Sequence, residues 1–374
     1  MQVKGKMTSA KIFIDEFDFS KDVPAINQVK ALCDLEVLKD SKIRIMPDMC
    51  PAIGTTIGST FTFNDKLMPV LVSSDIGCGI TILKLDTKKI EFEKLDRVIR
   101  EQLTERNKIE AILSKSQDKI DLNNLYCKKY VDTDRCLNKL GDLGGGNHFL
   151  EIDKDENGYL YLTVHSGSRL LGQQIYDFYM NEGYKAINDK SYNRIFTYLE
   201  DDLLSYYLKD VEIARRFAYL NRETILNIIV RYMKLKTSDF KIDCPHNYVD
   251  IDNKIIRKGA ISAQKDEDLI IPISASPIYG GIIIGTGKGN EDWNCSAPHG
   301  AGRLFSRGDS KDNFSFKTYK DEMKDVHSMS VTKASIDESP MVYKKREFIL
   351  RNIGESVKVD KILTPVYNFK KIEK

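Results

Sequence analysis

Within residues 141–169, two of the chain's five histidines flank a predicted β-hairpin: one comes just before its first strand and the other just after its second strand. The segments FLEI and YLYLTV are rich in β-branched and aromatic residues, and DKDENG between them is typical of a turn. Because paired strands lie side by side, His148 and His165 are expected to meet at the open end of this hairpin. Three glycines precede Asn147 and leave room for a ligand to approach the backbone. The two imidazoles are either metal ligands or one core and one capping histidine.

A second polar motif interrupts an apolar run at residues 71–85, which we expect to form two buried strands around SSDIGCG. An aspartate in an apolar setting needs a partner. Asp75 and Cys78, three residues apart in a tight loop, could bind one or two metal ions. The alternative is an inert buried cysteine beside a turn-capping aspartate. A third isolated histidine, His246, follows in CPHN.

The segment LIIPISASPIYGGIIIGTGKG resembles a phosphate-binding loop only superficially, because no glycine lies five residues before Gly287 and Gly289 stands where Ser or Thr is required. We therefore reject a Walker A motif, although Ser274 and Ser276 could present hydroxyls to a phosphate. Further on, Gly300 and Gly302 leave the surroundings of His299 open. If the next segment is helical, Arg303 and Arg307 share a face as an anion clamp; otherwise they are two solvated surface arginines.

The composition indicates a globular protein of mixed α and β structure. Of its 374 residues 41% are hydrophobic and 30% charged, and the net charge of +2 restricts any nucleic-acid surface to a local patch. Seven scattered cysteines without a signal peptide favour free thiols in the cytoplasm. No apolar run approaches the roughly 20 residues of a membrane span. We expect one domain over residues 1–374, with helices at 172–190, 192–209, 210–236 and 337–350 and a terminal strand at 362–371.

Together the motifs supply a thiolate, three imidazoles and a carboxylate from four separate segments. Such a set could hold a pair of divalent ions, with the thiolate or the carboxylate bridging them. His299 is then either a further ligand or a nucleophile, because a neutral imidazole can attack phosphorus to give a phosphoramidate.

At this point the sequence resembles the RtcB RNA ligases. The motifs MPDMCPAIGTTIGS, SSDIGCG, GDLGGGNHFLEI, VHSGSRLLG, FAYLNR, HGAGRLFSR, DESPMVYK and LTPVYNFK occur in the family's order from about residue 41 onward. The resemblance implies a single α+β domain with mixed sheets, flanking helices and a deep cleft for metal and nucleotide. It also implies an enzyme that uses GTP and two Mn²⁺ ions to join RNA 3′-phosphate or 2′,3′-cyclic phosphate ends to 5′-hydroxyl ends.

The resemblance assigns roles residue by residue. The expected manganese ligands are Asp75, Cys78, His148, His165 and His246, with Cys78 bridging, and the expected guanylylated nucleophile is His299. The expected nucleotide contacts are Asn147, His148, Glu151, His246, Asn247, Pro272, Ser274, Tyr279, His299, Gly300, Ala301, Gly302, Tyr343 and Lys370. The candidates for contacts to RNA phosphates are Arg135, Arg169, Arg303 and Arg307.

Several positions depart from the family pattern, including Cys50 in place of a histidine and Tyr279 in place of a small serine. These changes lie near the nucleotide and favour a divergent bacterial paralogue that acts in RNA repair. We expect a cytoplasmic monomer, with room for an activating protein partner. Two alternatives stay open: a dinuclear metal phosphoesterase that opens cyclic phosphates without a nucleotide, and a non-catalytic protein that binds RNA ends.

Overall fold

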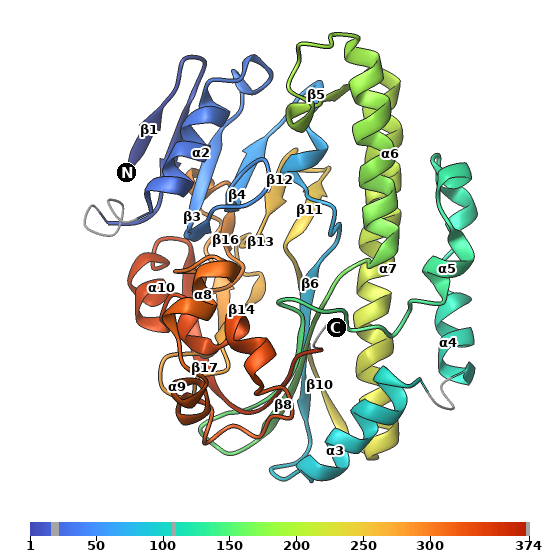
Figure 1. Ribbon diagram of the computed structural model, residues 1–374, viewed down its shortest axis with the longest axis vertical. Helices are drawn as coiled ribbons and strands as arrows, with labels where there is room; N and C mark the ends of the chain where they lie inside the picture. Colours follow the sequence, from blue (N-terminus) through green and yellow to red (C-terminus); the bar gives the residue numbers. More distant parts are fainter. Residues whose placement is uncertain (16–21, 107–109, 372–374) are drawn as a thin grey trace.

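The computed structural model describes residues 1–15, 22–106 and 110–371, and two large β-sheets organise it (Figure 1). The larger sheet has seven strands, and every adjacent pair in it is antiparallel. In spatial order its strands are β10 (Thr237–Pro245), β6 (Gly79–Leu85), β8 (Leu160–Ser166), β7 (Phe149–Lys154), β17 (Val357–Phe369), β15 (Gly281–Gly287) and β14 (Asp268–Ser274).

The predicted hairpin is confirmed. Strands β7 and β8 pair with Phe149 opposite His165, so His148 lies at the end of the hairpin next to His165. The terminal strand is also confirmed, since β17 pairs with β7 on one side and with β15 on the other. The C-terminal strand thereby sits near the centre of the larger sheet.

The second sheet has six strands, of which only β2 and β3 run parallel. Its strands are β1 (Gln2–Lys4), β2 (Ser9–Ile12), β3 (Ile43–Cys50), β4 (Ile57–Thr62), β12 (Ile255–Lys258) and β11 (Asn247–Asp250). Two short ribbons complete the strands: β13 (Ala260–Ser262) with β16 (Ser296–Pro298), and β5 (Lys66–Leu67) with β9 (Leu199–Glu200).

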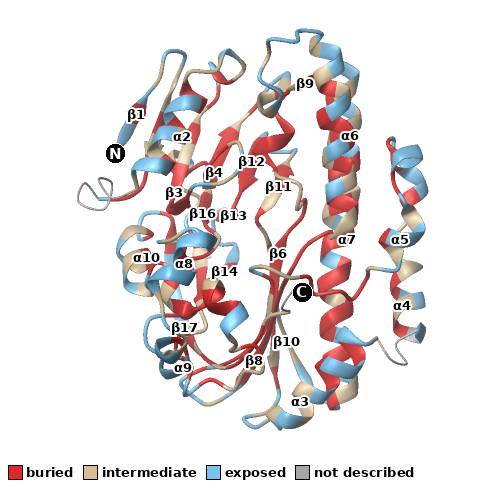
Figure 2. Cartoon of the chain, viewed as in Figure 1, coloured by how far each residue is buried: buried red, intermediate tan, exposed pale blue. Residues whose placement is uncertain are grey.

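Two long helices, α6 (Leu170–Ile187) and α7 (Asp201–Met233), stand beside the sheets, and one side of α7 is buried along most of its length (Figure 2). The shorter helices are α2 (Val23–Cys33), α3 (Phe92–Val98), α4 (Glu110–Gln117), α5 (Thr133–Leu137), α8 (Arg307–Asn313), α9 (Phe316–Glu322) and α10 (Arg346–Asn352). Among the described residues, no helix has both the length and the apolar character required to cross a bilayer.

Alternation along the central strands explains how the larger sheet is covered on both faces. Leu162 and Val164 of β8 pack with Ile225 and Ile229 of α7, whereas Tyr161 of the same strand belongs to the apolar cluster on the opposite face. Because successive side chains of a strand point to opposite faces, a strand between two layers is apolar at nearly every position. The ends of these buried strands are therefore held in fixed positions.

Three expectations about local structure are wrong. The first half of residues 71–85 is not a strand, because a 3-10 helix (Pro69–Leu71) precedes the SSDIGCG turn. The predicted helices at 192–209 and 210–236 form a single helix that begins only at Asp201, where two acidic residues suit the helix N-terminus. Of the two alternatives left open for the segment after Gly302, the helix that would place Arg303 and Arg307 on one face is not formed, since Ser306 caps α8 and this helix begins at Arg307.

The third wrong expectation is the helix at 337–350. A proline disfavours a helical conformation of the residue before it, and Ser339 before Pro340 is extended (φ −64°, ψ 150°). Two short 3-10 helices, Lys333–Glu338 and Pro340–Val342, and the separate α10 take the place of the single helix.

Candidate active site

Three histidines and one cysteine bring their ligand atoms together at one end of the larger sheet. The sulfur of Cys78 lies 3.3 Å from Nε2 of His148 and 3.2 Å from Nε2 of His165. Nε2 of His165 lies 3.3 Å from Nε2 of His246. Cys78, His148 and His165 form a candidate metal-binding group, with their ligand atoms all within 4.8 Å of one another.

Strand pairing explains why residues so far apart in the sequence meet. Cys78 immediately precedes β6, and the register of β6 with β8 places Ile80 opposite His165. On its other side β6 pairs with β10, after which His246 donates its backbone N–H to the carbonyl of Cys78 (2.8 Å). The ligand atoms thus lie at the ends of adjacent strands, where the sheet fixes their backbone positions.

Asp75 joins this group from the turn before Cys78. Its Oδ2 lies 3.1 Å from Nε2 of His148. A β-carbon at Gly167 would lie 2.1 Å from Oδ1 of Asp75, so a larger residue at position 167 would displace this carboxylate. Burial would raise the pKa of Asp75, but the hydrogen bond with His148 and the charges of His148 and Arg169 outweigh it and lower the pKa to about 2.

Burial sets the protonation of the other groups. It lowers the pKa of both His165 and His246 well below the usual value for histidine, with further lowering from neighbouring imidazoles. Burial and then the charge of Asp75 raise the pKa of the Cys78 thiol well above its usual value. The imidazoles of His165 and His246 are therefore neutral, which is the form that binds metals, and the thiol needs a nearby cation to ionise.

A metal ion fits this donor set. The buried Nδ1 of His246 has no hydrogen-bond partner among the described residues, and the Cys78 sulfur contacts Nε2 of both His148 and His165, while Nε2 of His165 also faces Nε2 of His246. Neutral imidazoles, a thiol and an ionised carboxylate together suit a borderline divalent cation. Asp75, Cys78, His148, His165 and His246 are the residues that would hold it.

Two buried residues of α7 support the backbone around this group. Arg222 donates from Nη1 to the carbonyls of Gly77 and Ser166, each at 3.0 Å, and forms an ion pair with Asp243. Asn221 donates to the carbonyl of Gly167 (3.2 Å). Since these carbonyls flank Cys78 and His165, the helix fixes the spacing between two of the ligand-bearing segments.

His299 lies next to the metal-ligand group and is held by Asp48. Its Nδ1 lies 2.6 Å from Oδ2 of Asp48, which also accepts the backbone N–H groups of His299 (3.1 Å) and Gly300 (3.3 Å). The ring centroid of His299 is 4.7 Å from that of His246. A carboxylate at Nδ1 favours the proton on that nitrogen and leaves the lone pair on Nε2 available.

Asp48 is a functional residue that the sequence analysis missed. It lies within β3 and is fully buried. A buried carboxylate inside an apolar strand requires a partner, and this requirement was the available signal. The close approach also depends on Gly302, where a β-carbon would lie 2.1 Å from the backbone oxygen of Asp48.

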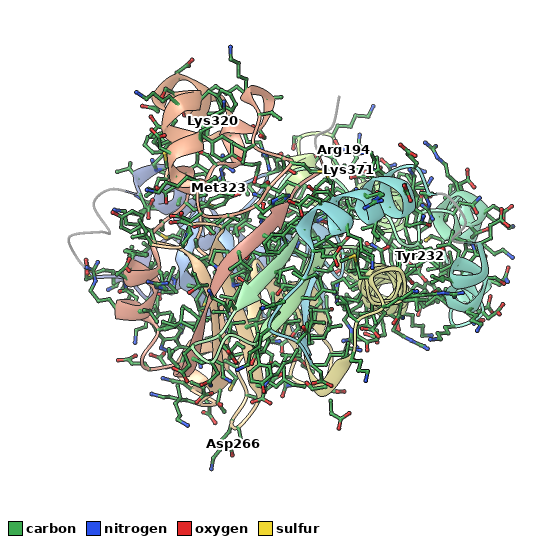
Figure 3. The ribbon with its side chains drawn as sticks, turned by 90° about the horizontal axis from the view of Figure 1, so that it is seen from below. Arg194, Tyr232, Asp266, Lys320, Met323 and Lys371 are labelled. Carbon is green, nitrogen blue, oxygen red and sulfur yellow. The ribbon has the colours of Figure 1, made fainter. Side chains whose placement is uncertain are left out.

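These groups open into one cavity of about 1270 Å³. Most of the predicted site residues line it: Asp75, Cys78, Asn147, Glu151, His165, His246, Asn247, Pro272, Ser274, His299, Gly300, Ala301, Gly302, Arg303, Arg307, Tyr343 and Lys370. Met323, the residue after helix α9, lines one side of the cavity and faces the body of the protein, whereas Lys320 lies on the outer side of the helix (Figure 3).

Some predicted residues are not brought to the cavity wall. Tyr279 is 40% exposed with the ammonium of Lys345 3.9 Å from its ring centroid, and Arg135 is exposed on α5. Arg169 lies behind the cavity wall, where its guanidinium donates to Nδ1 of His148 (3.0 Å). Ser276 is not available to a phosphate either, because its buried hydroxyl donates to Glu322 (2.5 Å).

The wall opposite His299 contains a buried carboxylate, Glu338, surrounded by cations. Its Oε1 lies 2.7 Å from Nη1 of Arg307 and 3.3 Å from Nη1 of Arg303. Its Oε2 accepts from Nζ of Lys370 (2.6 Å) and from the hydroxyl of Tyr343. Burial opposes ionisation, but the charges of Lys370 and Arg307 outweigh it and lower the pKa of Glu338 to about 2.

A second carboxylate, Glu151, faces the same cavity from β7. The side-chain amide of Asn368 on β17 donates to its Oε2 (2.7 Å). Burial raises the pKa of Glu151 to about 7, although Asn368, Asp153 and Lys370 act in the opposite direction. The cavity therefore joins the metal-ligand group and His299 to two carboxylates and several cations.

Comparison with known proteins agrees with this geometry. The family model described as tRNA-splicing ligase RtcB matches residues 28–133 and 99–371. The RNA-splicing ligase RtcB of Escherichia coli strain K12 is 28% identical over 365 residues, covering 85% of this chain and 87% of that protein. The tRNA-splicing ligase RtcB of Nanoarchaeum equitans is 25% identical and covers 82% and 83%. The chain belongs to the RtcB family.

Proposed function

We propose that the chain is an RNA ligase that uses GTP and Mn²⁺ to join RNA 3′-phosphate or 2′,3′-cyclic phosphate ends to 5′-hydroxyl ends, in RNA repair. The names of its relatives support RNA as the substrate. The observation that carries the proposal is the hydrogen bond between Asp48 and Nδ1 of His299, 2.6 Å long, beside the metal-ligand group. It leaves Nε2 of a neutral imidazole free to act as a nucleophile.

In the first step Nε2 of His299 attacks the α-phosphorus of GTP. A P–N bond forms, the bond to the β-phosphate oxygen breaks, and pyrophosphate leaves. The attacking ring becomes positively charged, and the adjacent carboxylate of Asp48 offsets this charge while keeping the ring oriented. The product is His299 that carries GMP.

In the second step an oxygen of the RNA 3′-phosphate attacks the same phosphorus, and His299 leaves as the neutral imidazole. The RNA now ends in a diphosphate linked to guanosine. The 5′-hydroxyl of the other RNA end then attacks the 3′-phosphorus, its proton passes to water, and GMP departs. Cyclic phosphate ends are first hydrolysed.

Manganese bound by Asp75, Cys78, His148, His165 and His246 would supply positive charge at the reacting phosphates. The chain contributes the orientation. Arg222 fixes the loop of Cys78, and Asp48 fixes His299. On the opposite wall, Lys370 and Tyr343 are the proposed nucleotide contacts, and Arg303 and Arg307 the proposed contacts to RNA phosphates.

The intact mass of the protein after incubation with GTP and Mn²⁺ tests this proposal. We expect the parent to gain one GMP and His299→Ala to gain none, and a 3′-phosphate RNA to remove the adduct. His327→Ala is the matched control, because His327 pairs with Asp96 away from the cavity (Nε2 to Oδ2, 2.7 Å). A metal-loaded parent that forms no adduct with any nucleoside triphosphate contradicts the proposal.

A dinuclear metal phosphoesterase acting on cyclic phosphate ends without a nucleotide is the second candidate. The observation in its favour is that Tyr279, a predicted nucleotide contact, does not line the cavity, whereas the metal-ligand group is assembled. Hydrolysis of RNA 2′,3′-cyclic phosphate by a protein that forms no adduct would select this candidate. We further propose a cytoplasmic monomer that an additional protein could activate, and the measured mass in solution tests the monomer.

A further inference from the structure

Glu338 is the only carboxylate among the described residues that contacts Arg303, Arg307, Lys370 and Tyr343 together. It is 7% exposed and lies on the wall of the cavity. Its two oxygens serve different groups: Oε2 binds Lys370 and Tyr343, and Oε1 binds the two arginines. One side chain thus links two sets of groups that the proposed function gives to different ligands.

The two arginines differ in how firmly they are held. The guanidinium of Arg303 also donates to the carbonyls of Phe305 (3.1 Å) and Asp337 (2.7 Å), and its side chain is 18% exposed. Within the described part of the chain, the guanidinium of Arg307 is bound only by the carboxylates of Glu338 and Asp337, and its side chain is 51% exposed. Arg307 can therefore turn toward another anion without loss of a backbone contact.

Arg307 also lies close to the far side of the cavity. A β-carbon at Gly146 would be 3.4 Å from its Nη2, so this arginine reaches the glycine loop that precedes Asn147. The three cationic side chains Arg303, Arg307 and Lys370 share the carboxylates of Glu338 and Asp337, which leaves one positive charge uncompensated. This wall is suited to an additional phosphate.

Resting on the proposed function, we propose that Glu338 is a positioning residue with two opposed effects. Through Oε2 it orients Lys370 and Tyr343 and thereby promotes nucleotide binding. Through Oε1 it competes with the RNA 3′-phosphate for Arg307 and thereby weakens RNA binding. A single carboxylate consequently favours loading of the nucleotide before the RNA end.

The test uses Glu338→Gln, with Asp337→Asn as the matched control because Asp337 pairs with Arg307 but not with Lys370 or Tyr343. For Glu338→Gln we expect the GTP concentration at half-maximal adduct formation to rise about tenfold, with the limiting rate nearly unchanged. Affinity for a 3′-phosphate oligonucleotide should increase, and its dependence on salt should steepen by about 0.7 in log–log slope. For Asp337→Asn we expect only the change in RNA binding.

Loss of both affinities in Glu338→Gln would overturn the proposal, because it would indicate a merely structural role. Unchanged GTP dependence would overturn it as well. If Glu338→Gln does not fold, Tyr343→Phe removes a single contact to Oε2 and should weaken GTP use while leaving RNA binding unchanged. Binding of 3′-phosphate and 3′-hydroxyl oligonucleotides is measured without GTP, so a parent that forms no adduct refutes the ligase activity separately from this coupling.

Discussion

The metal-ligand group and the Glu338 wall face the same cavity, but they are stabilised in opposite ways. Around Cys78 the donor atoms of imidazoles and a thiol face one another, and the segments that carry them are fixed at strand ends. Around Glu338 each of the cations Arg303, Arg307 and Lys370 already contacts a carboxylate of the protein. The comparison indicates that the first region needs a ligand to complete it, whereas the second is ordered beforehand and must exchange partners when a ligand arrives.

Removal of the Cys78 sulfur disrupts the metal-ligand group. We expect Cys78→Ala to lower metal affinity by at least about 100-fold and to abolish adduct formation, because a ligand to the metal is lost. The cobalt-substituted protein should also lose its thiolate charge-transfer absorption. Cys244→Ala is the control, since Cys244 is equally buried on β10 outside the cavity. Retention of the absorption band in Cys78→Ala would exclude Cys78 as a ligand.

Removal of the Asp48 charge tests the role of His299 as nucleophile separately from metal binding. We expect Asp48→Asn to slow adduct formation by roughly 10³-fold, as for a carboxylate that orients a catalytic histidine. Metal content should stay that of the parent. Asp96→Asn, which alters the corresponding pair with His327, should leave the rate unchanged. A change of less than threefold in the single-turnover rate of Asp48→Asn would contradict the role given to this pair, since even one lost hydrogen bond costs about that much.

Arg222 tests whether the ligand-bearing loops depend on α7. We expect Arg222→Met to reduce the free energy of unfolding by about 3–5 kcal/mol, because it leaves the carboxylate of Asp243 without its buried partner. Chemical denaturation of the metal-free protein measures this change. Arg215→Met serves for comparison, since Arg215 pairs with Glu212 on the same helix but is partly exposed, and should cost less than about 1 kcal/mol. Equal losses would show that the buried position is not important.

The pH dependence of stability tests how the region around Glu338 is stabilised. The pKa of Glu338 is about 2, below the usual value of 4.5, so its ionised form stabilises the fold above pH 4.5 and this contribution disappears as the pH falls toward 2. We expect Glu338→Gln to be less stable than the parent by up to about 3 kcal/mol at neutral pH, with the difference narrowing below pH 4.5. Urea unfolding at several pH values measures it. A difference that does not depend on pH would refute the charge-based explanation.

The sequence was sufficient to predict what depends on local pairing. Alternation and the turn at residues 153–158 placed His148 beside His165, and the structure confirms this hairpin. The meeting of Asp75 and His246 with that pair depends on β6 lying between β8 and β10, which no local pattern encodes. That these residues meet was suggested instead by the rarity of such polar groups in apolar surroundings and by the resemblance to the RtcB family.

The features that the sequence did not predict also have physical causes. A helix after Gly302 was one of two alternatives left open for Arg303 and Arg307, but Arg303 forms a bridge with Tyr343 and Ser306 starts α8 later. The arginines still converge, through Glu338 rather than through helical spacing. The role of Asp48 depends on a contact with a residue 251 positions away, which strand propensity cannot foresee.

The central place of β17 also has a consequence for synthesis of the protein. Strand β7 carries Glu151. The edge of β7 that does not pair with β8 pairs with residues 364–369, which the ribosome adds about two hundred residues later. Until then β7 would be the open edge of a hairpin, and open strand edges promote aggregation. Contacts between such distant segments also form slowly during folding. The strand that completes the cavity thus also protects the nascent chain, and we expect nascent chains that lack it to depend most on chaperones.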